Sequence, residues 1–194
     1  MHKIILASTA LAAAALNPSI ANAQAVPAAV VAVVDLDKVT TSCTACQTAQ
    51  TALRSQVAAL QAREKTLGTP LQSEQQSIQA AIDALKGKDP DAALQARIKA
   101  FQAKQQQGAA EIDRQQQQIK ANQQYIQKQI VDRLGPIYQQ VMQRHGANVL
   151  LETGATLATT SSVDVSNDVL AALNAALPTI QTTAPAVPAQ PQGR

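Results

Sequence analysis

The chain has 194 residues and a formal net charge of +3 at pH 7, and it contains no Trp, one Phe and two Tyr. This charge is too small to indicate a nucleic-acid-binding protein. Compact enzymes draw much of their buried area from large aromatic side chains, so the composition, rich in Ala and Gln, favours long helices and a scaffold or binding role.

The first 23 residues have the pattern of a secretory signal peptide. A cationic start at Lys3 precedes an apolar run over residues 4–16, and an Ala-x-Ala site ends at Ala23. The apolar run is shorter than the roughly 20 residues that a membrane-spanning helix needs. We therefore expect cleavage after Ala23, export across the inner membrane, and a soluble mature chain in the bacterial periplasm.

A short β-branched run follows the signal. Residues 30–34 read Val-Val-Ala-Val-Val, which predicts a buried strand. Asp35 and Asp37 come directly after it, where an acidic side chain can cap the start of a helix. Acid–base chemistry by this carboxylate pair is the weaker interpretation.

A long heptad stripe occupies the next stretch of chain. From Val39 to Leu85 one set of positions repeats at alternating steps of four and three, and most members are apolar. This spacing predicts a helix that packs along its length on another helix. Pro70 is expected to kink the helix, because it lacks an N–H and clashes with the carbonyl of Thr66.

A second helix is predicted to return along the first. Residues 87–91 (Gly-Lys-Asp-Pro-Asp) form a turn signal, and a stripe of the same spacing runs over residues 94–141. Pro136 should kink this helix near its base. Residues 144–146 (Arg-His-Gly) suit a helix C-terminus. The two stripes face one another in a long antiparallel hairpin, the arm, over residues 39–145.

The segment after the arm is predicted to complete a small body. Residues 148–152 and 155–158 read as two short strands, and a polar cluster at residues 164–168 caps a last helix over residues 169–177. Residues 182–194 are rich in Pro, Ala, Gln and Thr and predict a disordered tail.

These elements describe a mainly helical α+β fold in which a body carries a coiled-coil arm. The body comprises residues 26–38 and 146–181, and within residues 24–181 it forms one domain with the arm. Three short strands and one helix bury little apolar surface and leave strand edges exposed, so we expect the chain to oligomerise.

Cys43 and Cys46 have the spacing of a redox-active pair. A thioredoxin-like site would need a sheet-rich domain that the pattern does not provide. Both residues also fall on the apolar stripe, which favours packing or a disulfide suited to an oxidising compartment. His145 is the only histidine beyond the signal and has no partner of the same type, so we expect no metal site. No motif indicates a cofactor or a catalytic residue.

The layout resembles the Skp (OmpH-like) family of periplasmic chaperones for outer-membrane proteins. The resemblance covers nearly all of the mature chain, and it rests on residues 31–35, the polar hairpin, residues 149–152 and residues 164–170. It implies a homotrimer in which strands of three subunits form a small β-barrel, with Val31, Val33, Val149 and Leu151 in the oligomer core. Three arms would then surround a cavity that holds an unfolded outer-membrane protein without ATP.

The chain departs from the family pattern in several ways. Its arm is rich in Gln and nearly balanced in charge, whereas family arms are often strongly basic, and no basic cluster supports a lipopolysaccharide site. The Cys pair, Pro136 and the Pro-rich tail are additional. The resemblance predicts a holdase that binds unfolded outer-membrane proteins and itself, no nucleic acid, and works close to a membrane surface. The alternatives are a structural coiled-coil adaptor of the envelope and a thiol oxidoreductase that uses Cys43 and Cys46.

The middle of the arm is predicted to contain a hinge. Gly68 and Gly108 stand equally far from the turn, and Pro70 is close to both, so side-chain contacts and a backbone hydrogen bond are lost at one level of both helices. A hinge would let the cavity widen for larger clients. The alternative is a crossing point of small residues at which the helices pack closely.

Overall fold

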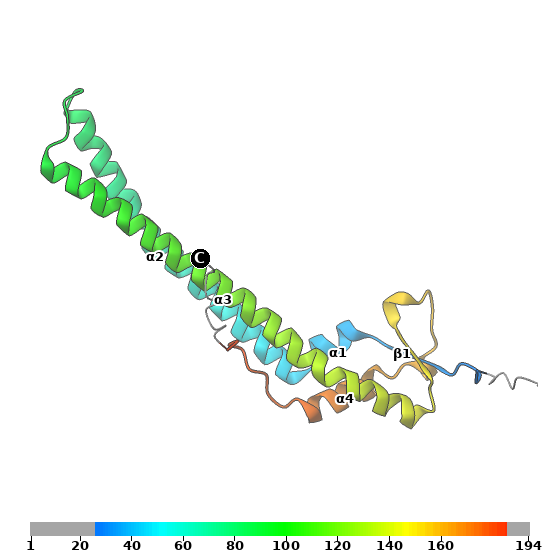
Figure 1. The fold of residues 1–194 in the computed structure, drawn as a ribbon. Helices are drawn as coiled ribbons and strands as arrows, with labels where there is room; N and C mark the ends of the chain where they lie inside the picture. Colours follow the sequence, from blue (N-terminus) through cyan, green and yellow to red (C-terminus); the bar gives the residue numbers. More distant parts are fainter. Residues whose placement is uncertain (1–25, 186–194) are drawn as a thin grey trace, which may run out of the picture.

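The computed structural model describes residues 26–185, so the predicted signal peptide lies outside the described residues. A long helical hairpin projects from a small body (Figure 1). The elements in chain order are β1 (Val31–Val34), α1 (Leu36–Ser42), α2 (Thr44–Ala84), α3 (Ala92–His145), β2 (Val149–Glu152), the 3-10 turns η1 (Thr153–Ala155) and η2 (Ser161–Val163), and α4 (Ser166–Ala176). The predicted fold class, mainly helical with a small sheet, is confirmed.

The sheet of the body has two parallel strands. Val31 of β1 lies opposite Val149 of β2, and Val33 lies opposite Leu151. The strands run parallel because the whole hairpin connects them and brings the chain back to its starting level. On its other side β1 meets Asp164, and the Val33 carbonyl accepts a hydrogen bond from the N–H of Val165 at 2.9 Å. Both sides of β1 are therefore engaged within one protomer.

The predicted strand at residues 155–158 is wrong. The N–H and the hydroxyl of Thr156 both donate to the carbonyl of Thr153, at 3.0 and 2.8 Å, so the backbone closes on itself in a turn. Leu157 is fully exposed. A strand there would gain no buried apolar contact from Leu157, although the outer edge of β2 is free among the described strands.

The first predicted helix is divided in two at Cys43. The backbone of Cys43 is extended (φ −64°, ψ 123°), so it ends α1 and caps α2. The heptad stripe crosses this break and is shifted at the base of α2. There Ala49 is buried, whereas Gln50 is exposed and Val57 is 38% exposed.

Further along the arm the two stripes meet as predicted. The seam between α2 and α3 buries Leu60, Ile78, Phe101, Gly108 and Asn122. Two ion pairs cross from one helix to the other, Arg63 to Glu111 and Arg97 to Glu74, each with 2.7 Å between nitrogen and oxygen. Both α2 and α3 continue through their internal prolines, Pro70 and Pro136.

The ends of the hairpin helices follow local sequence signals. At the tip, Lys86 and Gly87 have φ values of 47° and 88°, a left-handed conformation that glycine adopts without strain. Asp91 then caps α3 by accepting the N–H of Leu94 at 2.8 Å. At the base, Gly146 is left-handed (φ 63°) and ends α3. The predicted turn and C-terminal cap are confirmed.

The hydrophobic core lies where the body and the base of the hairpin meet. Val39, Val141, Val169 and Leu173 are each fully buried in it, and they come from α1, α3 and α4. The last helix begins at Ser166, earlier than predicted. The Ser166 hydroxyl accepts the N–H of Asp35, which ties α4 to the end of β1. The base of the arm is therefore part of the body's core.

The predicted disordered tail is wrong for its first residues. After α4 the chain turns back along the hairpin, and Thr182 and Ala184 form hydrogen bonds with α2 and α3. Figure 1 shows this orange-to-red segment beside the helices. Composition favoured disorder, but side-chain amides of the arm satisfy the backbone of this segment. Residues 186–194 lie outside the described residues.

Candidate functional site

A groove of about 910 Å³ opens at the base of the hairpin. Its walls come from α1, α2 and α3. The apolar part of the lining includes Leu36, Leu53, Ile126, Ile130, Val131, Leu134 and Tyr138. Val131 is 58% exposed, so an apolar side chain faces solvent at the edge of the groove. We call this hollow the base groove.

A second groove of about 490 Å³ lies further up the arm. Its walls come from α2 and α3 alone. It is lined by Glu64, Leu67, Gly68, Leu71, Gln105, Gly108, Ala109, Ile112, Asp113 and Gln116. Gly108 has no side chain to fill the seam, and Leu67 and Leu71 lie opposite it. We call this hollow the upper groove.

The two grooves lie on the same face of the hairpin. On α3, Ala109 and Gln116 line the upper groove, and steps of seven from them lead to Gln123 and Ile130 in the base groove. On α2, three steps of seven connect Gln47 in the base groove with Gly68 in the upper one. Residues seven apart stay on one face of a paired helix. Together the grooves form one grooved face along the arm.

The base groove combines small apolar patches with neutral amides, and the upper groove adds the carboxylates Glu64 and Asp113. In the base groove Gln47, Gln50, Gln123 and Gln127 alternate with aliphatic side chains, and the one charged residue in the lining is Arg54. Such a surface offers many weak contacts and no deep anchor for a single ligand. It suits apolar segments of varied sequence. Sequence reasoning identified the stripes but not this face, because the face depends on how the two helices are rotated against each other.

The predicted oligomer-core residues are paired in the sheet but differ in exposure. Val33 is 2% exposed within the protomer, whereas Val31 and Leu151 are 38% and 40% exposed. Val149 is half-buried. Val33 therefore already packs in the protomer's own core, whereas Val31 and Leu151 form a small apolar surface on the sheet.

The predicted hinge residues lie at one level of the arm. Gly68 and Gly108 both line the upper groove, and Pro70 is exposed on the same turn of α2 as Gly68. A Cβ added to Gly108 would lie 3.9 Å from Leu67 Cδ1, which is an ordinary contact, and one added to Gly68 would meet nothing within 4 Å. Either position therefore has room for alanine.

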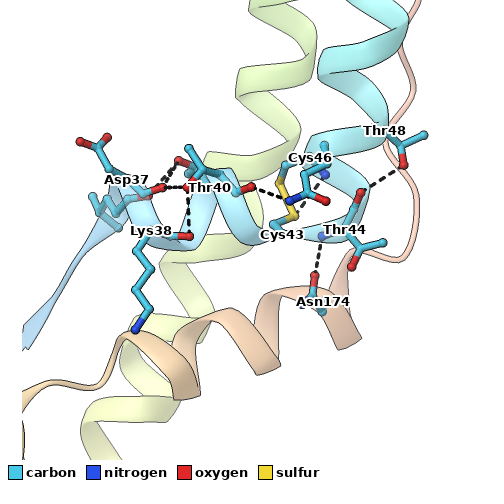
Figure 2. Close-up of a disulfide and its surroundings, with 11 residues drawn as sticks. Asp37, Lys38, Thr40, Cys43, Thr44, Cys46, Thr48 and Asn174 are labelled. Carbon is cyan, nitrogen blue, oxygen red and sulfur yellow. Dashed lines mark hydrogen bonds between the residues drawn. A yellow bond between two sulfur atoms is a disulfide. The ribbon is translucent and has the colours of Figure 1, made fainter.

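Cys43 and Cys46 are joined by a disulfide at the start of α2 (Figure 2). Both residues are buried, and Cys43 Sγ accepts the N–H of Cys46 at 3.2 Å. Asn174 of α4 accepts the N–H of Thr44 through its side-chain oxygen at 3.0 Å, which holds the same helix end from the other side. The disulfide is thus embedded where α1, α2 and α4 meet.

The other polar residues singled out in the sequence hold helix ends. Asp35 accepts the N–H of Lys38 at 2.8 Å and so caps α1. His145 Nε2 lies 2.8 Å from Asp168 Oδ2, which joins the end of α3 to the first turn of α4. Among residues 26–185 no group of three or more His, Cys, Asp or Glu is placed to hold a metal ion.

One carboxyl in the body has a perturbed pKa. Asp164 accepts hydrogen bonds from both the hydroxyl and the N–H of Ser166, and these bonds lower the pKa of the Asp164 carboxyl from its usual value. Ser166 itself is buried. The pair therefore stabilises the start of α4 and its junction with β1.

The fold defines a class of protein: a small body that carries a long helical arm with grooves along one face. The chain belongs to the outer membrane protein (OmpH-like) family, whose model matches residues 30–173. The crystal structure of a protein from Caulobacter crescentus CB15, described as an OmpH-like outer membrane chaperone, has a similar fold. Its TM-score is 0.69 at 21% identity, covering 86% of this chain and 96% of that one.

At this identity the structural likeness shows the fold alone. A search of curated proteins by sequence finds no match. Within residues 26–185, none of the helices combines the length and the apolar character of a membrane span.

Proposed function

We propose that the protein is an ATP-independent holdase of the periplasm, which binds unfolded outer-membrane proteins and prevents their aggregation. The observation that carries the proposal is the grooved face, where aliphatic side chains and neutral amides line two aligned grooves whose charged residues are Arg54, Glu64 and Asp113. Membership of the OmpH-like family supports it. A signal peptide over residues 1–23 would deliver the chain to that compartment.

The surface chemistry matches the task. An unfolded β-barrel protein exposes alternating apolar and polar side chains and an unpaired backbone, and it aggregates through these groups. Val131, Ile126 and Leu53 can cover small apolar segments, while glutamine amides can bond backbone groups. Binding the unfolded client by mass action needs no catalytic residue and no nucleotide.

The proposal includes a homotrimer assembled through the sheets of three bodies. Val31 and Leu151 are exposed apolar side chains on a two-stranded sheet, and β2 pairs with β1 on one side only among the described strands. A free strand edge and an apolar patch favour pairing with further copies. Three arms on such a body would turn their grooved faces towards a shared space, in which one client could contact all of them.

The test is dilution of a urea-denatured β-barrel protein into buffer with and without the mature chain, followed by light scattering. The wild type should suppress scattering at a low molar ratio. Val131→Lys, which places a charge at the edge of the base groove, should weaken suppression several-fold. Ile82→Lys is the matched control, since Ile82 is an exposed aliphatic residue (37%) that lines neither groove.

Equal suppression by both variants would refute the assignment of the grooved face. No suppression by the wild type would reject the holdase and leave a structural role for the arm. Circular dichroism should show unchanged helicity in both variants, because both substituted residues are exposed on helices.

A further inference from the structure

The chain that leaves α4 forms an extended strap along the arm. Residues 178–185, which we call the strap, run from the body towards the tip: Gln181 lies at the level of Gln129 on α3, and Ala184 lies at the level of Gln118 and Asn122. Figure 1 shows the strap beside α2 and α3. Exposure alternates along it, with Gln181 and Thr183 exposed and Thr182 and Ala184 half-buried. The strap is thus bound like a strand.

The arm holds the strap through side-chain amides. Gln129 binds Gln181 in both directions, accepting its N–H at 3.0 Å and donating to its carbonyl at 2.9 Å. Gln56 of α2 donates to the carbonyl of Thr182 at 3.2 Å.

Two more hydrogen bonds hold Ala184 of the strap. Asn122 accepts the N–H of Ala184 at 2.8 Å, and Gln118 donates to the carbonyl of Ala184 at 3.4 Å. All five hydrogen bonds run from a glutamine or asparagine side chain to the backbone of the strap. None of them involves a strap side chain, so this recognition does not depend on the sequence of the bound segment.

The amides are held in place by one another. Asn122 is 3% exposed, and its Nδ2 donates to Gln56 Oε1 at 2.8 Å. Gln118 donates to Asn122 Oδ1 at 2.8 Å. A buried amide with fixed partners keeps the neighbouring donors and acceptors oriented. We call Gln56, Gln118, Asn122 and Gln129 the amide face. On α3, Gln129 directly precedes Ile130, which lines the base groove. The amide face and the grooved face therefore lie on the same pair of helices.

We propose that the amide face is a binding site for extended polypeptide segments of any sequence, and that the strap occupies it in cis as a pseudo-client. An unfolded client would displace the strap and take over the five backbone bonds. This inference deepens the proposed function and rests on it for the identity of the client. Backbone pairing of an extended segment is a general mode of peptide recognition, and here side-chain amides take the place of a strand edge.

A peptide in trans tests the site directly. The probe is a fluorescein-labelled peptide with the sequence of residues 181–190, titrated by anisotropy into the mature chain and into a variant that ends at Ile180. The variant keeps Leu177 and Ile180, which pack on the core. A short tether gives an effective concentration of about 1 mM, so a segment with a Kd of about 0.1 mM in trans should bind about tenfold more weakly to the full chain.

Backbone methylation separates recognition of the backbone from recognition of side chains. N-methylation at Ala184 of the peptide removes the N–H that Asn122 accepts, and binding to the truncated variant should fall at least fivefold. N-methylation at Thr183 is the control, because the N–H of Thr183 donates to none of the described residues. A peptide of the same composition in reversed order should bind within about twofold of the original, as sequence-independent recognition requires.

A change in the arm completes the test. Gln129→Glu keeps an acceptor for the N–H of Gln181 but places a negative charge against its carbonyl, so binding should fall several-fold and the amide of Gln181 should exchange faster in the full chain. Gln124→Glu is the charge-matched control, at an exposed glutamine on α3 that is not among the side chains bonded to the strap.

The outcomes are distinct. Absence of peptide binding to the truncated variant at millimolar concentration, or equal loss on methylation at Thr183 and Ala184, would overturn the inference. Peptide binding without suppression of client aggregation would keep the amide face and reject the holdase. Suppression of aggregation that truncation and Gln129→Glu leave unchanged would keep the holdase and reduce the strap to a structural element.

Discussion

The proposed hinge at Gly68, Pro70 and Gly108 predicts that replacing these residues with Ala, Gln and Ala will stiffen the arm. Alanine favours a helix over glycine by about 1 kcal/mol, and an ordinary residue favours it over proline by about 3 kcal/mol. The structure leaves room for these changes, since a Cβ at Gly108 would meet only Leu67 and Leu71 at 3.9 and 4.0 Å. Gln at position 70 would also restore an N–H for the carbonyl of Thr66.

Hydrogen exchange measures the expected stiffening within one arm. Amides over residues 66–72 and 104–110 should exchange more slowly in the triple variant, while those of the tip and the base should be unchanged. In the proposed trimer, spin labels at Lys88 should show a narrower distribution of distances between arm tips. The stiffened protein should protect small clients as the wild type does and large clients poorly, because the cavity would no longer widen.

Gly135→Ala is the matched control. Gly135 lies inside α3 near the base, where it lines the base groove, and a Cβ there would meet nothing within 4 Å. The change therefore adds the glycine-to-alanine preference of about 1 kcal/mol away from the middle of the arm. If the triple variant is stabilised but the distance distribution and the dependence on client size stay as in the wild type, the hinge is refuted. The glycines would then serve only close packing of the seam.

Three further predictions follow from the body. Val33→Asp should unfold the protomer, because Val33 is 2% exposed and a buried unpaired charge costs several kcal/mol. Leu151→Asp, at a 40% exposed residue, should leave circular dichroism unchanged and yield monomers in light scattering. A Leu151→Asp trimer would contradict assembly through β2. Replacing Cys43 and Cys46 together with Ala should cost about 2 kcal/mol in urea unfolding, from the entropy of a short closed loop, with client protection unchanged; lost protection by a folded variant would indicate a thiol function. Because Ser166 lowers the pKa of Asp164, the ionised carboxyl stabilises the fold above pH about 4, and this contribution is lost as the pH falls through the folded pKa. Ser166→Ala should therefore reduce the urea midpoint more at pH 7 than at pH 2, and equal losses at both would reject the linkage.

The hairpin and its ends could be predicted from the sequence because their signals are local or periodic. Residues three and four apart lie on one face of any helix, so the stripes defined the seam that buries Ile78 and Phe101 before any partner was known. Asp35 and Gly146 act on the backbone within a few residues of themselves. Such features need no knowledge of where the rest of the chain lies.

Other features were decided by contacts between residues far apart in the chain. The break at Cys43 sits where Asn174, on the last helix, accepts the N–H of Thr44, and a stripe that crosses the break carries no sign of it. The turn at residues 153–156 stands where a strand was predicted, and the segment that meets the second side of β1 is Asp164, further along the chain.

The position of the strap also depends on contacts between residues far apart in the chain. Its composition is that of a disordered tail, and no residue within it forms a hydrogen bond through its own side chain. Gln129, 52 positions away, satisfies both backbone groups of Gln181, and it can do so only because α4 returns the chain to the arm. Backbone groups are the same at every residue, so a sequence cannot mark which of them will be bound; that depends on which side chains the folded arm places opposite them.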